Sequence, residues 1–71
     1  MPEEIKAQIT GVVFQVVATP GDRVGAGDPI LVLESMKMEI PVEAPRVGTV
    51  VEIKVKEGET VQEGETVALL D

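Results

Sequence analysis

Apolar and charged residues alternate strictly in one segment of the second half of the chain, Val51-Glu52-Ile53-Lys54-Val55-Lys56. A period of two is typical of a β-strand with one buried face and one solvent face. The matching segment, residues 14–18, predicts an inward set of Phe14, Val16 and Ala18. Thirteen valines and five isoleucines fill the stretches between glycines and prolines, and these residues favour strands. The pattern therefore predicts an all-β fold.

The chain also repeats itself. When it is shifted by 37 residues, residues 1–34 fall on 38–71, and residues 35–37 remain as a connector. The identical pairs are Met1/Met38, Ala7/Ala44, Gly11/Gly48, Val13/Val50, Gly21/Gly58, Val24/Val61, Gly27/Gly64 and Leu33/Leu70. The repeated glycines stand at turn positions, where they decide the backbone conformation. We therefore expect one domain over residues 1–71, made of two half-repeats.

Each half is expected to form four short strands. The expected strands cover residues 3–9, 12–18, 23–25, 30–34, 39–44, 49–56, 60–62 and 67–70. Each half has one apolar face, which it can bury only against the other half. We expect a flattened β-barrel or sandwich of two four-stranded antiparallel sheets with pseudo-twofold symmetry. Thr19-Pro20-Gly21-Asp22 fits a type II turn, and residues 56–59 are its copy. Gly25-Ala26-Gly27-Asp28 similarly matches residues 62–65.

Residues 33–39 are rich in helix-forming residue types, so propensity alone predicts a short helix there. The repeat favours a hairpin instead, because residue 34 corresponds to residue 71, where the last strand ends. Met36 and Lys37 must then turn without the glycine that marks most two-residue hairpins. Such a turn stores about 1–3 kcal/mol of strain, and strain tends to occur at functional sites.

Charge and composition exclude several function classes. Thirteen acidic and six basic residues give a net charge of −7, which argues against binding nucleic acid or an anionic membrane surface. The chain has no cysteine and no histidine, so it lacks thiolate metal ligands, disulfides and the commonest general base. Its single aromatic residue, Phe14, gives little to line a small-molecule pocket. Because Met1-Pro2-Glu3-Glu4 is acidic where a signal peptide is basic, we expect a cytoplasmic location. The lack of histidine and cysteine and the single aromatic residue predict a non-enzymatic domain. We expect this domain to be monomeric in isolation.

Lys37 lies at the join of the two halves. A lysine on a hairpin tip is usually only solvated, and Lys6 and Lys54 fit that interpretation. Lys37 differs because Met36 and Met38 flank it, and burial of each methionine would normally gain about 1.5–3 kcal/mol. Either methionine could instead fold back onto the core. An exposed amine between two apolar side chains suits a handle that another enzyme acylates.

The segment Glu34-Ser35-Met36-Lys37-Met38-Glu39 resembles the attachment motif of biotinyl domains, the carrier modules of biotin-dependent carboxylases. The family usually has Ala-Met-Lys-Met, and here Ser35 replaces the alanine. Residues 42–48 resemble the Ala-Pro and Gly that begin the family's second half, and Gly58-Glu59 and Gly64-Glu65 resemble its Gly-Asp turns. The resemblance covers the whole chain, and it is closest to small stand-alone biotin carboxyl carrier proteins of acyl-CoA carboxylases, without a thumb segment.

The resemblance implies that a biotin protein ligase attaches biotin to Lys37 as an amide. A biotin carboxylase then loads a carboxyl group, and a carboxyltransferase passes it to an acceptor. The family pattern makes Met36 and Met38 flanking recognition residues, while Glu34, Ser35 and Glu39 complete the motif. The departure at residues 7–11, which keep only the outer two residues of the family's Ala-Pro-Met-Pro-Gly, lies away from the lysine.

Three other functions stay open. A lipoyl carrier domain shares the fold, although its lysine usually lies between Asp and Ala. An unmodified structural β module would need no Met-Lys-Met turn. A substrate that is modified only for regulation, or as a decoy, would look the same in sequence.

Overall fold

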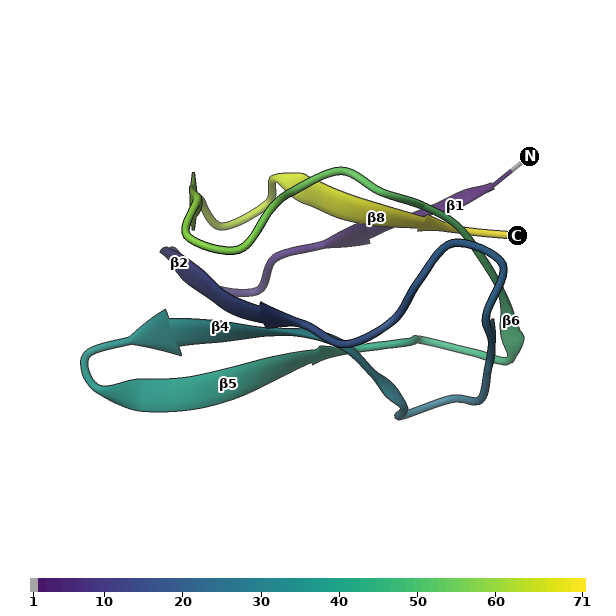
Figure 1. The fold of residues 1–71 in the computed structure, drawn as a ribbon, viewed down its shortest axis with the longest axis horizontal. Coiled ribbons are helices and arrows are strands. Elements are labelled where there is room, and N and C mark those ends of the chain that lie inside the picture. Colours follow the sequence, from purple (N-terminus) through teal and green to yellow (C-terminus); the bar gives the residue numbers. More distant parts are fainter. Residues whose placement is uncertain (1) are drawn as a thin grey trace.

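Eight strands form two four-stranded antiparallel sheets, and residues 2–71, which this computed structural model describes, contain no helix (Figure 1). The strands are β1 (Glu3–Lys6), β2 (Gly11–Val16), β3 (Arg23–Val24), β4 (Pro29–Ser35), β5 (Met38–Glu43), β6 (Gly48–Ile53), β7 (Thr60–Val61) and β8 (Thr66–Leu70). The all-β architecture is therefore confirmed. Met1, which the repeat pairs with Met38, lies outside the described residues.

The two halves of the sequence are interleaved between the sheets. One sheet has the order β1-β8-β6-β3 and the other β5-β4-β2-β7, so each sheet takes two strands from each half. We call the second one the hairpin sheet, because β4 and β5 are joined directly through the Met36-Lys37 turn (Figure 1). Since every sheet contains strands from both halves, neither half can complete its hydrogen bonding alone.

The core lies between the two sheets and is entirely aliphatic. Alternation along each strand sends every second side chain inward, as expected for a sheet with one solvated face. The most deeply buried side chains are Ile30, Leu31, Leu33, Leu70, Val13, Val50, Val61 and Val67. Among residues 2–71 no charged or polar side chain is buried, so the fold is held by apolar burial and backbone hydrogen bonds.

Four repeated turns close the loops, and each contains a glycine in the left-handed region. Gly21, Gly27, Gly58 and Gly64 have φ between 88° and 98°, a conformation that costs little only for glycine. In each turn the residue after the glycine is Asp or Glu, and its carboxylate accepts a hydrogen bond from the backbone N–H of the turn's first residue. The Asp22 carboxylate, for example, accepts the Thr19 N–H at 2.9 Å. The predicted turn positions are confirmed.

The predicted inward set of the second strand is wrong in one member. Val16 is half-buried and Ala18 is buried, but Phe14 is 49% exposed. The pairing of β2 with β4 shifts between Val13 and Gln15, which is a β-bulge that leaves Phe14 unpaired. A bulge turns two successive side chains toward the same face, so strict alternation fails there.

The same irregularity occurs at the equivalent place in the second half. The register of β6 with β8 shifts between Val50 and Glu52, and the bulged residue, Val51, is 42% exposed. The segment that alternates perfectly in sequence therefore does not alternate perfectly in space. Bulges at Phe14 and Val51, 37 residues apart, preserve the pseudo-twofold symmetry.

Both ends of the described chain lie at the end of the domain opposite the Met36-Lys37 turn (Figure 1). Glu3 pairs with Leu70 at the edge of the first sheet. Arg46 fastens this end: its Nε donates to Glu3 Oε1 at 2.8 Å, and its Nη1 donates to the carbonyl of Val47 at 2.8 Å. The domain is elongated, with extents of 32 × 18 × 17 Å. No helix within residues 2–71 is long and apolar enough to cross a membrane.

Candidate functional site

The hairpin between β4 and β5 turns through two residues that are not glycine. Ser35 pairs with Met38, so strand pairing extends one residue into the predicted connector and the loop is Met36-Lys37 alone. Their φ angles are +51° and +65°, and positive φ at both central residues is typical of a type I′ turn. The predicted glycine-free hairpin is confirmed, and the predicted alternative of a helix is wrong.

Left-handed backbone at two bulky residues is held by the pairing below it. Each such residue costs of order 1–3 kcal/mol, and it persists only where the surrounding structure fixes it. Here six registered residue pairs between β4 and β5, from Pro29 with Glu43 to Ser35 with Met38, supply that support. The strained turn is thus a fixed platform rather than a loose loop.

All three side chains of the Met-Lys-Met segment point into solvent. Met36 is 92% exposed, Met38 is 62% exposed, and Lys37 is exposed as well. The alternative in which a methionine folds back onto the core is therefore wrong. Two flexible thioethers beside an amine form a small, adaptable apolar surface of the kind that partner proteins bind.

Two carboxylates lie beneath the tip. Glu34 and Glu39 are directly opposite one another in the β4–β5 ladder, and both are exposed. Like charges in facing positions destabilise a sheet by up to about 1 kcal/mol. Neither carboxylate has an ion pair or a hydrogen bond to another part of residues 2–71. Ser35, between Glu34 and the turn, is half-buried.

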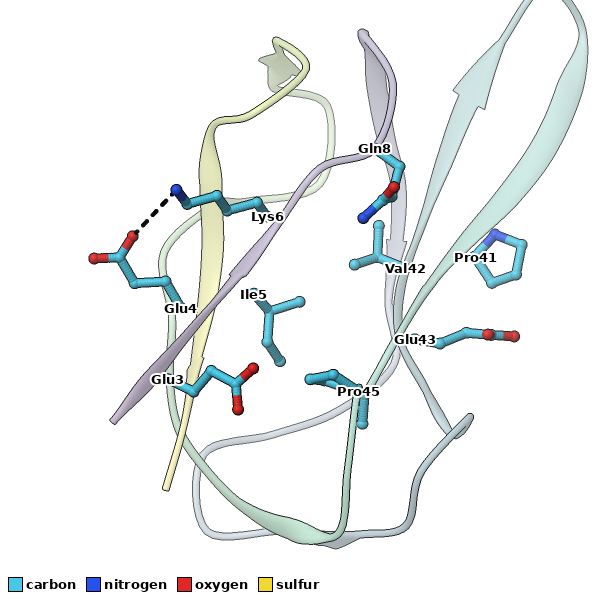
Figure 2. Close-up of a pocket in the computed structure, with 10 residues that line it drawn as sticks. Glu3, Glu4, Ile5, Lys6, Gln8, Pro41, Val42, Glu43 and Pro45 are labelled. Carbon is cyan, nitrogen blue, oxygen red and sulfur yellow. Dashed lines mark ion pairs between the residues drawn. The ribbon is translucent and has the colours of Figure 1, made fainter. Parts of the chain in front are cut away.

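A pocket of about 470 Å³ lies elsewhere, between the edge strands β1 and β5 of the two sheets (Figure 2). Its apolar lining includes Ile5, Val42 and Pro45, and the Glu4–Lys6 ion pair, 4.0 Å long, lies at one side. The residues of the Met-Lys-Met tip do not line it. Across residues 2–71, no three acidic side chains gather in a way that could hold a metal ion. The exposed amine of Lys37 is therefore separate from this pocket.

The sequence and fold were compared with known proteins. Residues 1–70 match the Biotin_lipoyl family, which carries the description "Biotin-requiring enzyme".

The chain belongs to this family. It is 43% identical over 70 residues to the biotinylated protein TB7.3 homolog of Mycobacterium leprae, covering 99% of both chains. It is 44% identical over 61 residues to a biotin/lipoyl attachment protein of Bacillus subtilis, covering 86% of this chain and 84% of that one.

Among solved structures, the chain is similar to the Kluyveromyces lactis urea carboxylase, with a TM-score of 0.95 and 37% identity. The match covers 100% of this chain but only 6% of that enzyme. The resemblance, the fold and the predicted cofactor class, biotin, are thus confirmed for this member of the Biotin_lipoyl family.

The structure brings together every residue of the predicted site, since residues 34–39 form the top of one hairpin. What sequence reasoning missed is the role of the acids after the turn glycines. Glu59 Oε1 accepts the Lys56 N–H at 2.6 Å, and Glu65 Oε1 accepts the Gln62 N–H at 3.0 Å. The recurrence of Gly followed by Asp or Glu in all four turns was the available signal.

Proposed function

We propose that the protein is a biotin carboxyl carrier, with biotin joined as an amide to Nζ of Lys37. The observation that carries this proposal is an exposed lysine at the tip of a fixed hairpin, flanked by Met36 and Met38. Membership of the Biotin_lipoyl family supports it, as do the names of its relatives, which include a biotinylated protein and a biotin carboxyl carrier protein of acetyl-CoA carboxylase.

The residues present fit a covalently held biotin. An amide requires one accessible primary amine, and Lys37 presents its amine on a turn whose neighbours are both exposed. No side chain of residues 2–71 pairs with it. In the attachment step the Lys37 nitrogen bonds to the carbonyl carbon of biotinyl-AMP held by a ligase, and AMP leaves. The ammonium group loses two of its three protons as it becomes a neutral amide. The net charge then changes from −7 to one unit more negative.

When bound, biotin supplies a ureido nitrogen that accepts a carboxyl group and later releases it. The protein itself contributes position. The strained but well-paired hairpin holds Lys37 at one end of a domain 32 Å long, and the four methylenes of the lysine provide the mobile arm. Tethering of this kind replaces free diffusion by a high local concentration at the partner site. The protein acts as a non-catalytic carrier in this scheme.

Three partners follow from the proposal: a biotin protein ligase, a biotin carboxylase and a carboxyltransferase. Each must recognise the tip and release it again. Small, weak interfaces suit such repeated encounters, and the exposed Met36 and Met38 supply adaptable contact area for them. Because the partners are separate proteins in this scheme, the isolated domain is expected to be a monomer.

The test is an intact-mass measurement after coexpression with a biotin protein ligase and biotin. The expected result is one biotinyl adduct on the wild-type protein and none on Lys37→Arg, because a guanidinium is not acylated at neutral pH. The matched control is Lys54→Arg, the same change at an exposed lysine that directly follows β6. This variant should keep the adduct. A lipoyl adduct would support a lipoyl carrier, and no adduct would support a structural module.

A further inference from the structure

The two sheets are related by the internal repeat, yet their outer faces differ in chemistry. On the hairpin sheet, registered pairs place Val12 beside Glu34 and Glu39, and place Val32 beside Gln15 and Pro41. These positions alternate with core residues and therefore face outward. We call the outward set Val12, Phe14, Val32, Pro41, Glu34 and Glu39 the hairpin face.

The hairpin face is more apolar than a solvated sheet face needs to be. Val12 is 39% exposed and Phe14 is 49% exposed, Pro41 is exposed and Val32 is half-buried. Phe14 is the only aromatic residue of the chain, and the β2 bulge turns it outward beside Gln15. A sheet face that exposes an aromatic side chain and several aliphatic ones is typical of protein interaction sites.

The equivalent positions on the other sheet, 37 residues away, are more polar. Val12 corresponds to Thr49 and Pro41 corresponds to Glu4, whereas Phe14 and Val32 correspond to Val51 and Leu69, which are also apolar. The charges there are also paired. Glu4 lies 4.0 Å from Lys6 and accepts the Thr66 hydroxyl at 2.9 Å. This face is neutralised by contacts within the domain.

The hairpin face, in contrast, has unpaired negative charge. The strands of the hairpin sheet contain no lysine or arginine. Glu34 and Glu39 face each other and have no ion pair within residues 2–71. The nearest cation along the chain is Lys37, and the proposed amide would remove its charge. Modification therefore makes this end of the domain more attractive to a basic surface.

We propose that the hairpin face binds the biotin carboxylase. The matching site on that enzyme is a basic surface that surrounds an apolar depression. The inference rests on the proposed carrier function. Two observations point to this partner rather than the ligase. Loss of the Lys37 charge strengthens attraction to a basic surface only after the ligase has acted, and an enzyme that binds ATP and bicarbonate needs cationic groups around its site. Phe14 fills the apolar depression, and Glu34 and Glu39 pair with the basic rim.

The experiment uses the intact biotinylated protein as substrate for a purified biotin carboxylase with ATP and bicarbonate. Phe14→Ser is expected to raise KM roughly tenfold with little change in kcat, because buried aromatic anchors dominate interface energies. Val51→Ser, at the equivalent bulge of the other sheet, is the matched control and should stay within about twofold of wild type. Phe14→Leu should recover most of the loss. Equal thermal unfolding of the two serine variants shows that both are folded.

A second measurement tests the charge. Glu34→Gln with Glu39→Gln should reduce the dependence of kcat/KM on ionic strength, because fewer charges attract the partner. Equal effects of Phe14→Ser and Val51→Ser would overturn the proposal, as would slower ligase transfer to Phe14→Ser with an unchanged KM for the carboxylase. Failure of the proposed function is distinct, since it appears earlier as a wild-type protein that takes up no biotin.

Discussion

Replacement of Gly11 by alanine tests how tightly the hairpin sheet is packed beneath the site. A Cβ added at Gly11 would lie 2.7 Å from the carbonyl oxygen of Glu34, which is backbone and cannot rotate away. The strands must separate to reach the 3.4 Å of ordinary contact. Overpacking of this kind costs about 1–3 kcal/mol. Alanine also reduces the entropy of the unfolded chain, which stabilises by about 0.4–1 kcal/mol.

With the middle of each range, the expected net loss for Gly11→Ala is about 1.3 kcal/mol, which lowers Tm by about 5–10 °C in a domain of this size. The assay is thermal and urea unfolding followed by circular dichroism. Gly25→Ala is the matched control, because a Cβ there meets only the Asp28 carboxylate at 3.6 Å and the backbone is not left-handed. It should unfold at or slightly above the wild-type temperature. If Gly11→Ala proves as stable as Gly25→Ala, the close approach of β2 to Glu34 is not a constraint.

Three further outcomes are expected. Met36→Leu combined with Met38→Leu keeps apolar volume and should slow carboxylation of the biotinylated protein more than it slows ligase transfer. If the double variant is carboxylated as fast as wild type, the methionine side chains contribute only apolar volume. Leu33→Ala removes a fully buried side chain and should cost about 2–5 kcal/mol in urea unfolding, and a smaller loss would mean that the core collapses around the gap. Glu59→Ala removes the acceptor of the Lys56 N–H and should cost about 1 kcal/mol, whereas Glu59→Gln, which keeps an oxygen acceptor, should lose less.

Much of the fold could be predicted because the repeat and the residue types agree. Most of the seven glycines and five prolines lie at strand ends or in turns, with Pro41 inside β5 as an exception, and valine-rich segments fill the strands between them. At residues 33–39 the two signals disagree, because the residue types favour a helix and the repeat predicts a hairpin. Tertiary pairing overrode that propensity: β4 already pairs with β2, and only a turn at Met36-Lys37 lets β5 pair with β4. The internal repeat carried this information, and propensity did not.

The bulges could not be predicted in the same way. Nothing in the local sequence distinguishes Phe14 or Val51 from an inward strand residue, because both are apolar and stand where alternation places a core position. A bulge arises from the pairing, here opposite Val32 in β4 and Leu69 in β8. The hydrophobic periodicity of one strand carries no information about how that strand pairs with its neighbour. The outward aromatic side chain, and hence the hairpin face, became visible only with the paired sheets in place.

Arg46 binds Glu3 through Nε and donates from Nη2 to the Leu70 carbonyl of the last strand at 3.5 Å. This arrangement has a consequence for any longer polypeptide that contains such a domain. A linker joined at either end would hold the domain by its base, so the amine of Lys37 would sweep an arc whose radius is the linker length plus the 32 Å of the domain. A few residues added to the linker would then enlarge the volume that the lysine arm can reach. A shortened linker would keep the arm from reaching the next active site.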